Sequence, residues 1–443
     1  MKKLLLILFL FVTNFLYSQN NAVELDRLYP SIPVSRNFPA SFEIRMEKGQ
    51  VYRVKVQQLG VDVKVAVKRD GAVLFEQDSP NGNTGLEDFN YTAASSSKFQ
   101  LLIERLEEQG NPDSGKVSLI IKNYSKTELA NLEKLRRELE TENRKDVLSL
   151  DIDHFWQAYD ELKKAKSRGD SINTIQTLYL DRATDGLRDF INASQFTAEK
   201  FVNALGRFPK FYASVRANTM KVKQAEPDVQ ETINNFKKLY ANFTSAKVCF
   251  AIGLVNTGGT VSSKFVLIGT EVTTSTRDID LSEFGNSAFS KALAGDTNII
   301  QKVKDVVAHE SVHIQQTTKL DPESISCPLL YSCMSEGFCD FIGELTSGGQ
   351  INKRLLEYGD THENELWKQF KSQLCGNFQG EWLYNYSTVK DKPADLGYYI
   401  GYKIAQAYYN KAADKRQAII DIIELKNPLK FLEKSGYDKA SKK

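Results

Sequence analysis

The sequence is poor in histidine, cysteine and proline, and each scarcity excludes a kind of protein. It has 4 histidines, 5 cysteines and 11 prolines in 443 residues. With 41% hydrophobic and 26% charged residues as well, the composition is typical of a globular protein and excludes a fibrous or disordered chain. Five cysteines are too few for a disulfide-stapled scaffold of this length, so we expect at most one bridge and otherwise buried free thiols.

An excess of charge of one sign is also missing. The formal net charge is +2, and it falls to zero once Lys2 and Lys3 are left out. A neutral chain exerts no long-range attraction on nucleic acid or on anionic membranes. We therefore predict that neither is a partner, and nothing in the sequence predicts an oligomeric state.

Long hydrophobic runs are absent apart from one at the N-terminus. Lys2 and Lys3 precede an apolar run from Leu4 to Leu16, and the small residue Ser18 follows it. This order is typical of a secretory signal, and the run is too short to remain as a membrane span. Residues 1–18 are therefore predicted to be a signal peptide. We expect the protein to be exported to the periplasm, the cell surface or the medium.

Residues 22–124 show the period of two that is typical of β-strands. Apolar and polar residues alternate around Val54 and again around Val65, and Asp70-Gly71 supplies a hairpin turn between strands. The region is predicted to be an antiparallel β-sandwich. It contains no histidine.

The composition changes at Ser125, where glutamate, lysine, arginine and leucine take over. Ser125 and Glu128 form a capping box, so residues 125–150 are predicted to be a helical linker. Residues 151–443 are predicted to be a mainly helical domain with a small β-sheet, which makes the whole chain α+β.

Three helices and one hairpin are expected early in this domain. The periodicity predicts helices over Ile152 to Ala165, Ile172 to Ser194 and Thr197 to Met220, the last broken or kinked at Pro209. Val248 to Val255 and Phe265 to Thr273 are predicted to be two strands of a hairpin, joined by glycine-rich turn residues. We expect the strand from Phe265 to lie at the sheet edge, where an extended peptide could pair with it.

Two of the four histidines fall in one motif, His309-Glu310-Ser311-Val312-His313. It fits H-E-x-x-H in a stretch without proline or glycine, so a helix would place both imidazoles on one face. Zinc accepts imidazole ligands, and a catalytic zinc site keeps one coordination position for a water molecule. Glu310 is placed to take a proton from that water. Chance matches to five residues are common, but the motif also puts Glu310 at the edge of an apolar stripe, where a cation would compensate its charge.

A third ligand is available on the next predicted helix, from Leu329 to Leu345. Glu336 lies 23 residues after His313, and Asp340 lies one turn further on the same face. Asp340 could accept a hydrogen bond from the far nitrogen of a metal-bound histidine. Lone acids usually belong to solvated faces, but the run from Leu329 to Ile342 has no lysine or arginine, which favours the ligand interpretation.

H-E-x-x-H followed by E-x-x-x-D resembles the gluzincin pattern of thermolysin-type metallopeptidases. Ser335 to Asp340 and Gly397 to Ile404 further resemble a family of predicted zinc-dependent proteases related to gliding-motility lipoproteins. The resemblance spans roughly residues 151–409 and implies a zincin-like fold, Zn²⁺ as cofactor and peptides or proteins as substrates. It also implies that His309, His313 and Glu336 are ligands, that Glu310 is the general base and that Asp340 supports a ligand. At the position after Glu-Gly-x, where the family usually has a small residue, this chain has Cys339. The N-terminal region resembles pre-peptidase domains of secreted proteases.

A peptidase also needs a hydrogen-bond donor for the oxyanion. Tyr399 and Tyr402, three residues apart, are our first candidates, followed by Tyr398 and His362. Tyrosines on an apolar helix are more often core residues with satisfied hydroxyls. His154, distant from every motif, is expected to be structural.

Two other functions stay open at this stage. The chain could be a non-catalytic envelope or surface assembly factor that retains a zincin fold, or it could hydrolyse another bond by the same chemistry. A pure binding protein has no need for Glu310 beside the ligands, so the intact set His309, Glu310, His313 and Glu336 favours a zinc peptidase.

Overall fold

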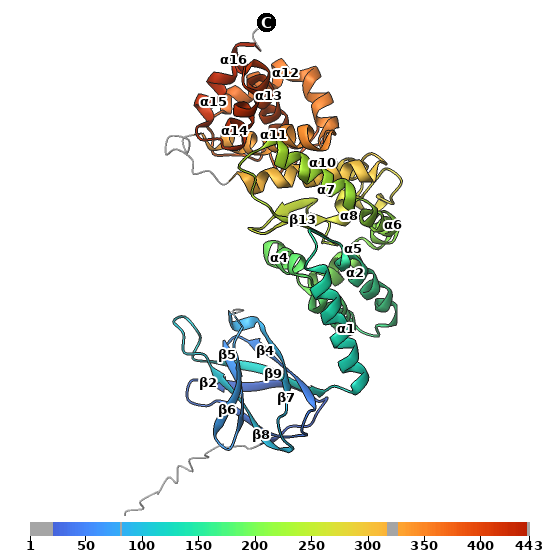
Figure 1. The fold of residues 1–443 in the computed structure, drawn as a ribbon, viewed down its shortest axis with the longest axis vertical. Coiled ribbons are helices and arrows are strands. Elements are labelled where there is room, and N and C mark those ends of the chain that lie inside the picture. The colour runs from blue at the N-terminus through green and yellow to red at the C-terminus, as the bar shows by residue number, and fades with distance from the viewer. Residues whose placement is uncertain (1–20, 80–81, 317–326, 441–443) are drawn as a thin grey trace, which may run out of the picture. The chain divides into compact units, whose positions relative to one another are not determined.

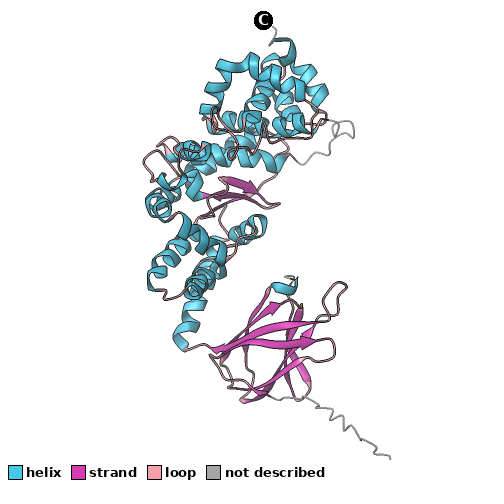
Figure 2. Ribbon diagram, turned by 180° about the vertical axis from the view of Figure 1, so that it is seen from behind, coloured by secondary structure: helices cyan, strands magenta, loops and turns pink. Residues whose placement is uncertain are grey.

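The computed structural model describes residues 21–79, 82–316 and 327–440. The chain divides into two compact units, one ending at Arg136 and the other beginning at Arg137 (Figures 1 and 2). The first is built mainly of strands and the second mainly of helices, so the predicted α+β fold class is confirmed. The predicted signal peptide, residues 1–18, lies outside the described residues.

The first unit is a β-sandwich of two sheets, with strand orders β1-β3-β8-β5-β6 and β2-β9-β4-β7. All pairs are antiparallel except β1 with β3. Asp70 and Gly71 both have positive φ (51° and 83°) and form the predicted hairpin turn between β5 and β6. The strands are β1 (Asn21–Ala22), β2 (Leu28–Ser35), β3 (Ala40–Met46), β4 (Val51–Leu59), β5 (Val63–Arg69), β6 (Ala72–Gln77), β7 (Leu86–Thr92), β8 (Ser97–Arg105) and β9 (Ser114–Asn123).

Helix α1 (Lys126–Glu142) follows the last strand of the sandwich. The predicted capping box is present: the Ser125 amide donates to Glu128 Oε2 (2.7 Å), and the Glu128 amide donates to Ser125 Oγ (3.2 Å). These two bonds satisfy amides that the first turn of a helix leaves unpaired.

The second unit contains a four-stranded sheet in the order β10-β11-β13-β12. Its strands are β10 (Val147–Leu148), β11 (Lys247–Ala251), β12 (Gly259–Val261) and β13 (Phe265–Gly269). The predicted hairpin is wrong, because β11 and β13 are parallel neighbours and β12 alone is antiparallel to β13. The predicted edge is also wrong, since β13 lies between β11 and β12. The glycine-rich segment expected to be a turn carries a short strand of its own.

The loop that leads from β11 to β12 is held by a buried carboxylate. Glu271 accepts hydrogen bonds from the amides of Gly253 (2.7 Å) and Val255 (2.9 Å). Val255 has a φ of 58°, which is unfavourable for a β-branched residue. The Glu271 contacts therefore stabilise a backbone conformation that the local sequence does not favour.

Helices make up the rest of the second unit. The predicted helix from Ile172 to Ser194 is interrupted by a 3₁₀ turn at Leu180–Arg182. The helix predicted from Thr197 to Met220 is broken, as one of the two expected outcomes, because Pro209 starts a new helix. The helices are α2 (Leu150–Glu161), α3 (Arg168–Leu178), α4 (Asp185–Ser194), α5 (Ala198–Arg207), α6 (Pro209–Met220), α7 (Glu226–Leu239), α8 (Thr270–Thr273), α9 (Ala288–Leu293), α10 (Ile299–Gln315), α11 (Pro328–Ser347), α12 (Lys353–Gln373), α13 (Leu396–Lys411), α14 (Lys415–Ile423), α15 (Pro428–Ser435) and α16 (Tyr437–Ala440).

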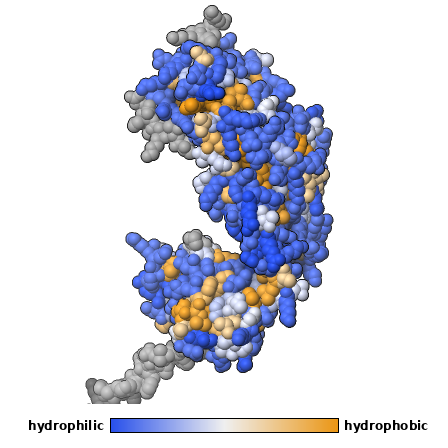
Figure 3. All heavy atoms as spheres, viewed as in Figure 1, coloured by the Kyte–Doolittle hydropathy of each residue, from blue (hydrophilic) through white to orange (hydrophobic). Residues whose placement is uncertain are grey.

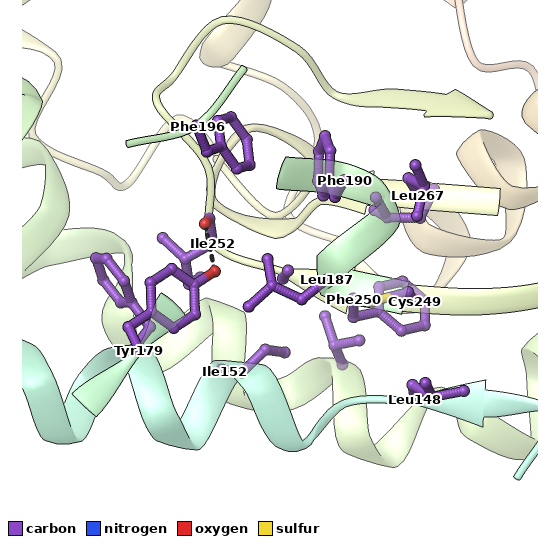
Figure 4. Close-up of a cluster of buried hydrophobic side chains, with 14 of the residues drawn as sticks. Leu148, Ile152, Tyr179, Leu187, Phe190, Phe196, Cys249, Phe250, Ile252 and Leu267 are labelled. Atoms are coloured by element: carbon purple, nitrogen blue, oxygen red, sulfur yellow. Dashed lines mark hydrogen bonds between the residues drawn. The ribbon is translucent and has the colours of Figure 1, made fainter. Parts of the chain in front are cut away.

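Two hydrophobic cores meet at α10. The first core packs α2 and α4 against one side of the sheet, and α10 lies on the other side (Figure 1). Figure 4 shows part of this core, where the Tyr179 hydroxyl donates to the Ile252 carbonyl (2.6 Å). Val303 and Val307 of α10 belong to the first core, and Val312 belongs to a second core built by α11 to α15. Helix α10 is therefore anchored on two sides.

The face drawn in Figure 3 is largely hydrophilic, with apolar patches. The first unit exposes several large apolar side chains, which are Leu28, Phe38, Leu59, Val73 and Leu74. Among the described residues, no helix combines the length and the apolar composition needed to cross a membrane.

Candidate metal centre

Helix α10 carries the H-E-x-x-H motif. The Asn298 side chain caps it by accepting a hydrogen bond from the Gln301 amide (3.2 Å), and the helix continues without proline or glycine. His309 and Glu310 are buried, and His313 is half-buried. The packing of α10 against both cores thus fixes where these side chains lie.

Helix α11 supplies Glu336 and packs closely against α10. At Gly343, an added Cβ would lie 3.3 Å from the backbone nitrogen of His309. The absence of a side chain at this glycine therefore allows α10 and α11 to pack closely enough for their side chains to meet at one centre. The predicted helix from Leu329 to Leu345 is confirmed with slightly wider bounds.

The structure brings His309, His313 and Glu336 together. The two Nε2 atoms lie 3.2 Å apart, and Oε2 of Glu336 lies 3.5 Å from Nε2 of His309 and 3.3 Å from Nε2 of His313. Zinc bonds of about 2.0–2.2 Å in a tetrahedron separate neighbouring ligand atoms by roughly 3.3–3.5 Å. These three atoms thus have the mutual spacing that one zinc ion requires.

Each imidazole is oriented by a partner on its other nitrogen. Nδ1 of His309 lies 2.7 Å from Oδ1 of Asp340, whose Oδ2 accepts a hydrogen bond from the Asn352 side chain (2.8 Å). Nδ1 of His313 lies 3.0 Å from Oε1 of Gln316. Both Nδ1 atoms therefore donate, so each imidazole in its neutral form presents an Nε2 lone pair to a cation. Asp340 is at the predicted place, whereas the sequence analysis missed Gln316 and Asn352.

Gln316 could have been found from its spacing of three after His313 at the end of a helix. Its side chain is fixed from α11, since Nε2 donates to the Ser335 carbonyl (3.0 Å) and Oε1 accepts from the Ser335 hydroxyl (3.0 Å). Asn352 lies just before α12 and carries no motif that marks it.

A thiol offers a second possible set of ligands. One ligand atom each from His309, His313 and Cys339 lie within 4.8 Å of one another. However, Sγ of Cys339 approaches Nδ1 of His313 (3.4 Å), the nitrogen that already contacts Gln316. Burial and the neighbouring carboxylates also raise the pKa of the Cys339 thiol well above its usual range. Glu336, which faces both Nε2 atoms, is the better third donor.

The pKa values at this centre follow from its charges. Burial opposes ionisation of Glu336, but hydrogen bonds and charge from His309 and His313 outweigh it and lower its pKa well below the usual range. Burial would lower the pKa of His309, yet Asp340 and Glu336 raise it well above 6.5. Two imidazoles beside two acids therefore form a centre whose negative groups favour a cation.

Glu310 lies between the centre and the edge of the sheet. Burial raises its pKa, and the two histidines act in the opposite direction. A Cβ added to Gly259 of β12 would lie 2.5 Å from Oε1 of Glu310, so the strand backbone passes directly over this carboxyl group. Only glycine leaves room for Glu310 in its present position.

The structure does not bring Tyr399 or Tyr402 to the centre. The Tyr399 hydroxyl donates to Asp360 (3.1 Å), and the Tyr402 hydroxyl donates to Glu344 (2.6 Å). The reason lies in how α13 packs. Added Cβ atoms at Gly337 and Gly401 would collide with the backbone of the facing helix, so α11 and α13 touch along their glycines and α13 cannot turn another face to the centre.

Two other tyrosines, Tyr398 and Tyr384, lie at the candidate metal centre instead. The Tyr398 ring stacks on the His309 ring (centroids 6.0 Å apart, 20° between planes). The Tyr384 hydroxyl donates to Oε1 of Glu336 (3.0 Å). Tyr398 was a secondary candidate, but Tyr384 was missed because it lies in an irregular segment without periodicity. His362 contacts the Tyr358 carbonyl (2.8 Å) instead, and His154 is buried on α2.

One disulfide joins Cys327, at the start of α11, to Cys375, and the other three cysteines are free and buried. This agrees with the expectation of at most one bridge.

Comparison with known families identifies the helical region that holds this centre. Residues 287–425 match the family described as "Predicted Zn-dependent protease (DUF2268)". The resemblance seen in the motifs of α11 and α13 is thereby confirmed, over a range that begins later than the sequence analysis expected. The matched region contains all of α10, α11, α12 and α13. The family description implies zinc and points to peptides or proteins as substrates.

Solved structures match about a quarter of the chain. The pre-peptidase C-terminal domain of a Bacillus anthracis collagenase matches at 15% identity and a TM-score of 0.19, covering 23% of this chain and 93% of that domain. A periplasmic inhibitor of g-type lysozyme from Salmonella Typhimurium matches at 20% identity and a TM-score of 0.18, covering 24% of this chain and 98% of its own. No curated protein matches the sequence.

Proposed function

We propose that this protein is an exported zinc-dependent peptidase, with His309, His313 and Glu336 as the metal ligands and Glu310 as the general base. The observation that carries the proposal is the spacing of 3.2–3.5 Å among three donor atoms whose partners leave them free to bind a cation. The match of residues 287–425 to a zinc-protease family supports it.

Zinc, when bound here, would polarise the substrate carbonyl and make a water molecule more acidic. The Glu310 carboxylate would accept the proton of the attacking water and pass it to the nitrogen of the leaving amine. Its burial beside Gly259 keeps bulk water away from the carboxyl group. Asp340 and Gln316 would hold the imidazoles in the tautomer that presents Nε2.

Strand β12 offers a place for the substrate backbone. Within the described part of the chain it is the outer strand of the sheet. Hydrogen bonds join Gly258 to Gly269 (3.0 Å) and Ser262 to Phe265 (2.8 Å), so alternation in an antiparallel pair turns the amides of Gly259 and Val261 outward. An extended peptide that paired with them would lie beside Glu310, which supports endopeptidase or aminopeptidase chemistry on extended chains.

Export is the second part of the proposal. It rests on the signal-like residues 1–18, and the disulfide between Cys327 and Cys375 supports it, because such bonds persist in oxidising compartments.

The test compares purified wild type with Glu310→Gln and Glu336→Gln. We expect wild type and Glu310→Gln to hold about one zinc per chain by elemental analysis, because the base is not a ligand, and Glu336→Gln to hold much less. Only wild type should cleave a broad peptide library. Glu433→Gln, at an exposed glutamate of α15, is the matched control and should behave as wild type. Equal cleavage by Glu310→Gln would remove Glu310 from the mechanism, and zinc binding without cleavage by wild type would favour the assembly-factor alternative.

A further inference from the structure

Tyr384 is an exposed residue whose hydroxyl nevertheless reaches the metal centre. The residue is 66% exposed, and its hydroxyl donates to Oε1 of Glu336 (3.0 Å). The other oxygen of the same carboxylate faces His309 and His313. Tyr384 therefore joins the candidate ligand Glu336 to the solvent, through the carboxylate oxygen that does not face the histidines.

The backbone around Tyr384 is held in an unfavourable conformation. Tyr384 has a φ of 57° and Asp395 has a φ of 60°, values that residues other than glycine rarely adopt. Asn385 and Asp395 hold the segment by reciprocal bonds, from the Asn385 amide to Oδ1 of Asp395 (3.3 Å) and from the Asp395 amide to Oδ1 of Asn385 (2.8 Å). Both side chains are buried. Such conformations persist where the surroundings enforce them, and they are concentrated at functional sites.

Tyr398, the other phenol near Glu336, is less suited to contact a substrate. Its ring is stacked on His309, and α13 packs tightly on α11 beside it through Gly337 and Gly401. Tyr384 is 66% exposed, so its hydroxyl is open to exchange Glu336 for an acceptor that arrives from solvent. A hydroxyl that can change its acceptor can donate a hydrogen bond to an oxygen atom that becomes negative during a reaction.

We propose that Tyr384 is a catalytic residue, which donates a hydrogen bond from its hydroxyl to the scissile carbonyl oxygen as that oxygen becomes negative. The proposal rests on the proposed peptidase function and assigns the oxyanion donor that hydrolysis of an amide requires. The phenol keeps its proton throughout, so Glu310 remains the only residue that transfers one. Before substrate binds, the hydrogen bond to Glu336 satisfies the hydroxyl.

The test is Tyr384→Phe, which removes the hydroxyl alone. Because the side chain is exposed, the variant should fold, and thermal unfolding checks this. Tyr408→Phe is the matched control, since it also removes a bond from a phenol to a carboxylate, that of Asp421 (2.6 Å), outside the centre. Three quantities are measured: zinc content, kcat and KM on a cleaved peptide, and affinity by calorimetry for a peptide phosphonamidate, whose tetrahedral phosphorus imitates the reaction intermediate.

We expect Tyr384→Phe to keep its zinc and its KM, and to lose about 10²–10³-fold in kcat, as for removal of one oxyanion donor. Its affinity for the phosphonamidate should fall by a similar factor, while Tyr408→Phe matches wild type in all three measurements. Unchanged kcat and unchanged phosphonamidate affinity would overturn the proposal. Loss of zinc, with kcat restored by excess zinc, would also overturn it and make Tyr384 a positioning residue for Glu336. If wild type neither cleaves peptides nor binds the phosphonamidate, the proposed function itself fails, and the role of Tyr384 fails with it.

Discussion

Nδ1 of His309 lies 2.7 Å from Oδ1 of Asp340, and this pair joins α10 to α11 at the candidate metal centre. The carboxylate holds the imidazole proton on Nδ1, so Nε2 of His309 is the nitrogen that could bind a metal, beside Nε2 of His313. The side-chain amide of Asn352 holds the carboxylate in turn. The tautomer of one candidate ligand is thus determined by residues from α11 and from the segment before α12.

Replacing Asp340 should therefore weaken zinc binding without removing a ligand. We expect Asp340→Ala to lower zinc affinity by about 10–100-fold, the usual effect of losing a carboxylate that supports a metal-bound histidine. Competition with a chromogenic chelator measures the dissociation constant. Asn352→Ala should have a smaller effect in the same direction, because it acts through Asp340. If both variants bind zinc as tightly as wild type, His309 does not depend on this chain of hydrogen bonds.

Gly259 should determine the position of Glu310. A Cβ at residue 259 would lie 2.5 Å from Oε1 of Glu310 and would displace the carboxyl group. We expect Gly259→Ala to lower kcat about 10²-fold while zinc content stays unchanged, because small misplacements of a catalytic group are costly. The neighbouring Gly258→Ala is the control, since its Cβ would meet no atom closer than 3.5 Å. Equal losses in both variants would point to a general disturbance of β12 instead.

The sequence alone was sufficient to predict those site residues that are spaced at helical intervals. The spacing of four within His309 to His313, and again from Glu336 to Asp340, fixes which side chains share a face once a helix forms, and these side chains do meet. The edge strand was not predictable, because the three residues from Gly259 to Val261 are too few for a period of two to show. Tyr384 was not predictable either, because its position depends on a loop without periodicity that is held by Asn385 and Asp395.

Gly337 and Gly401 should be necessary for stability. Added Cβ atoms at these positions would collide with backbone atoms of the facing helix, which cannot move aside as a flexible side chain can. We expect Gly337→Ala to lower the free energy of unfolding by about 1–3 kcal/mol or more, as overpacking usually does. Gly206→Ala provides the contrast, because this helical glycine has no atom within 4 Å of an added Cβ and should gain about 0.5–1 kcal/mol. Urea unfolding measures both, and equal effects would exclude close packing of α11 on α13 as the cause.

Two buried carboxyl groups should make stability depend on pH. Burial raises the pKa of Asp151 to about 7, against hydrogen bonds from Thr184 that lower it, and burial raises the pKa of Glu271 to about 7 against the amides of Gly253 and Val255. Both values are higher in the folded chain than the ordinary values of about 4 in the unfolded chain. Between these limits the two carboxyl groups bind more protons in the folded state, so their contribution to the free energy of unfolding should fall as the pH rises from about 4 to about 7.

Asp151→Asn should reduce this dependence on pH. Asparagine keeps an oxygen that can accept from the Thr184 amide, and its NH₂ group can donate to the Thr184 hydroxyl, so the contact survives without a titrating group. We expect the variant to lose less stability than wild type between pH 5 and pH 8, and the remaining slope to reflect Glu271 among other groups. Urea unfolding at four pH values gives both curves. Identical slopes for wild type and Asp151→Asn would mean that Asp151 carries the same charge in the folded and unfolded states, and its burial would then have to be compensated by its hydrogen bonds alone.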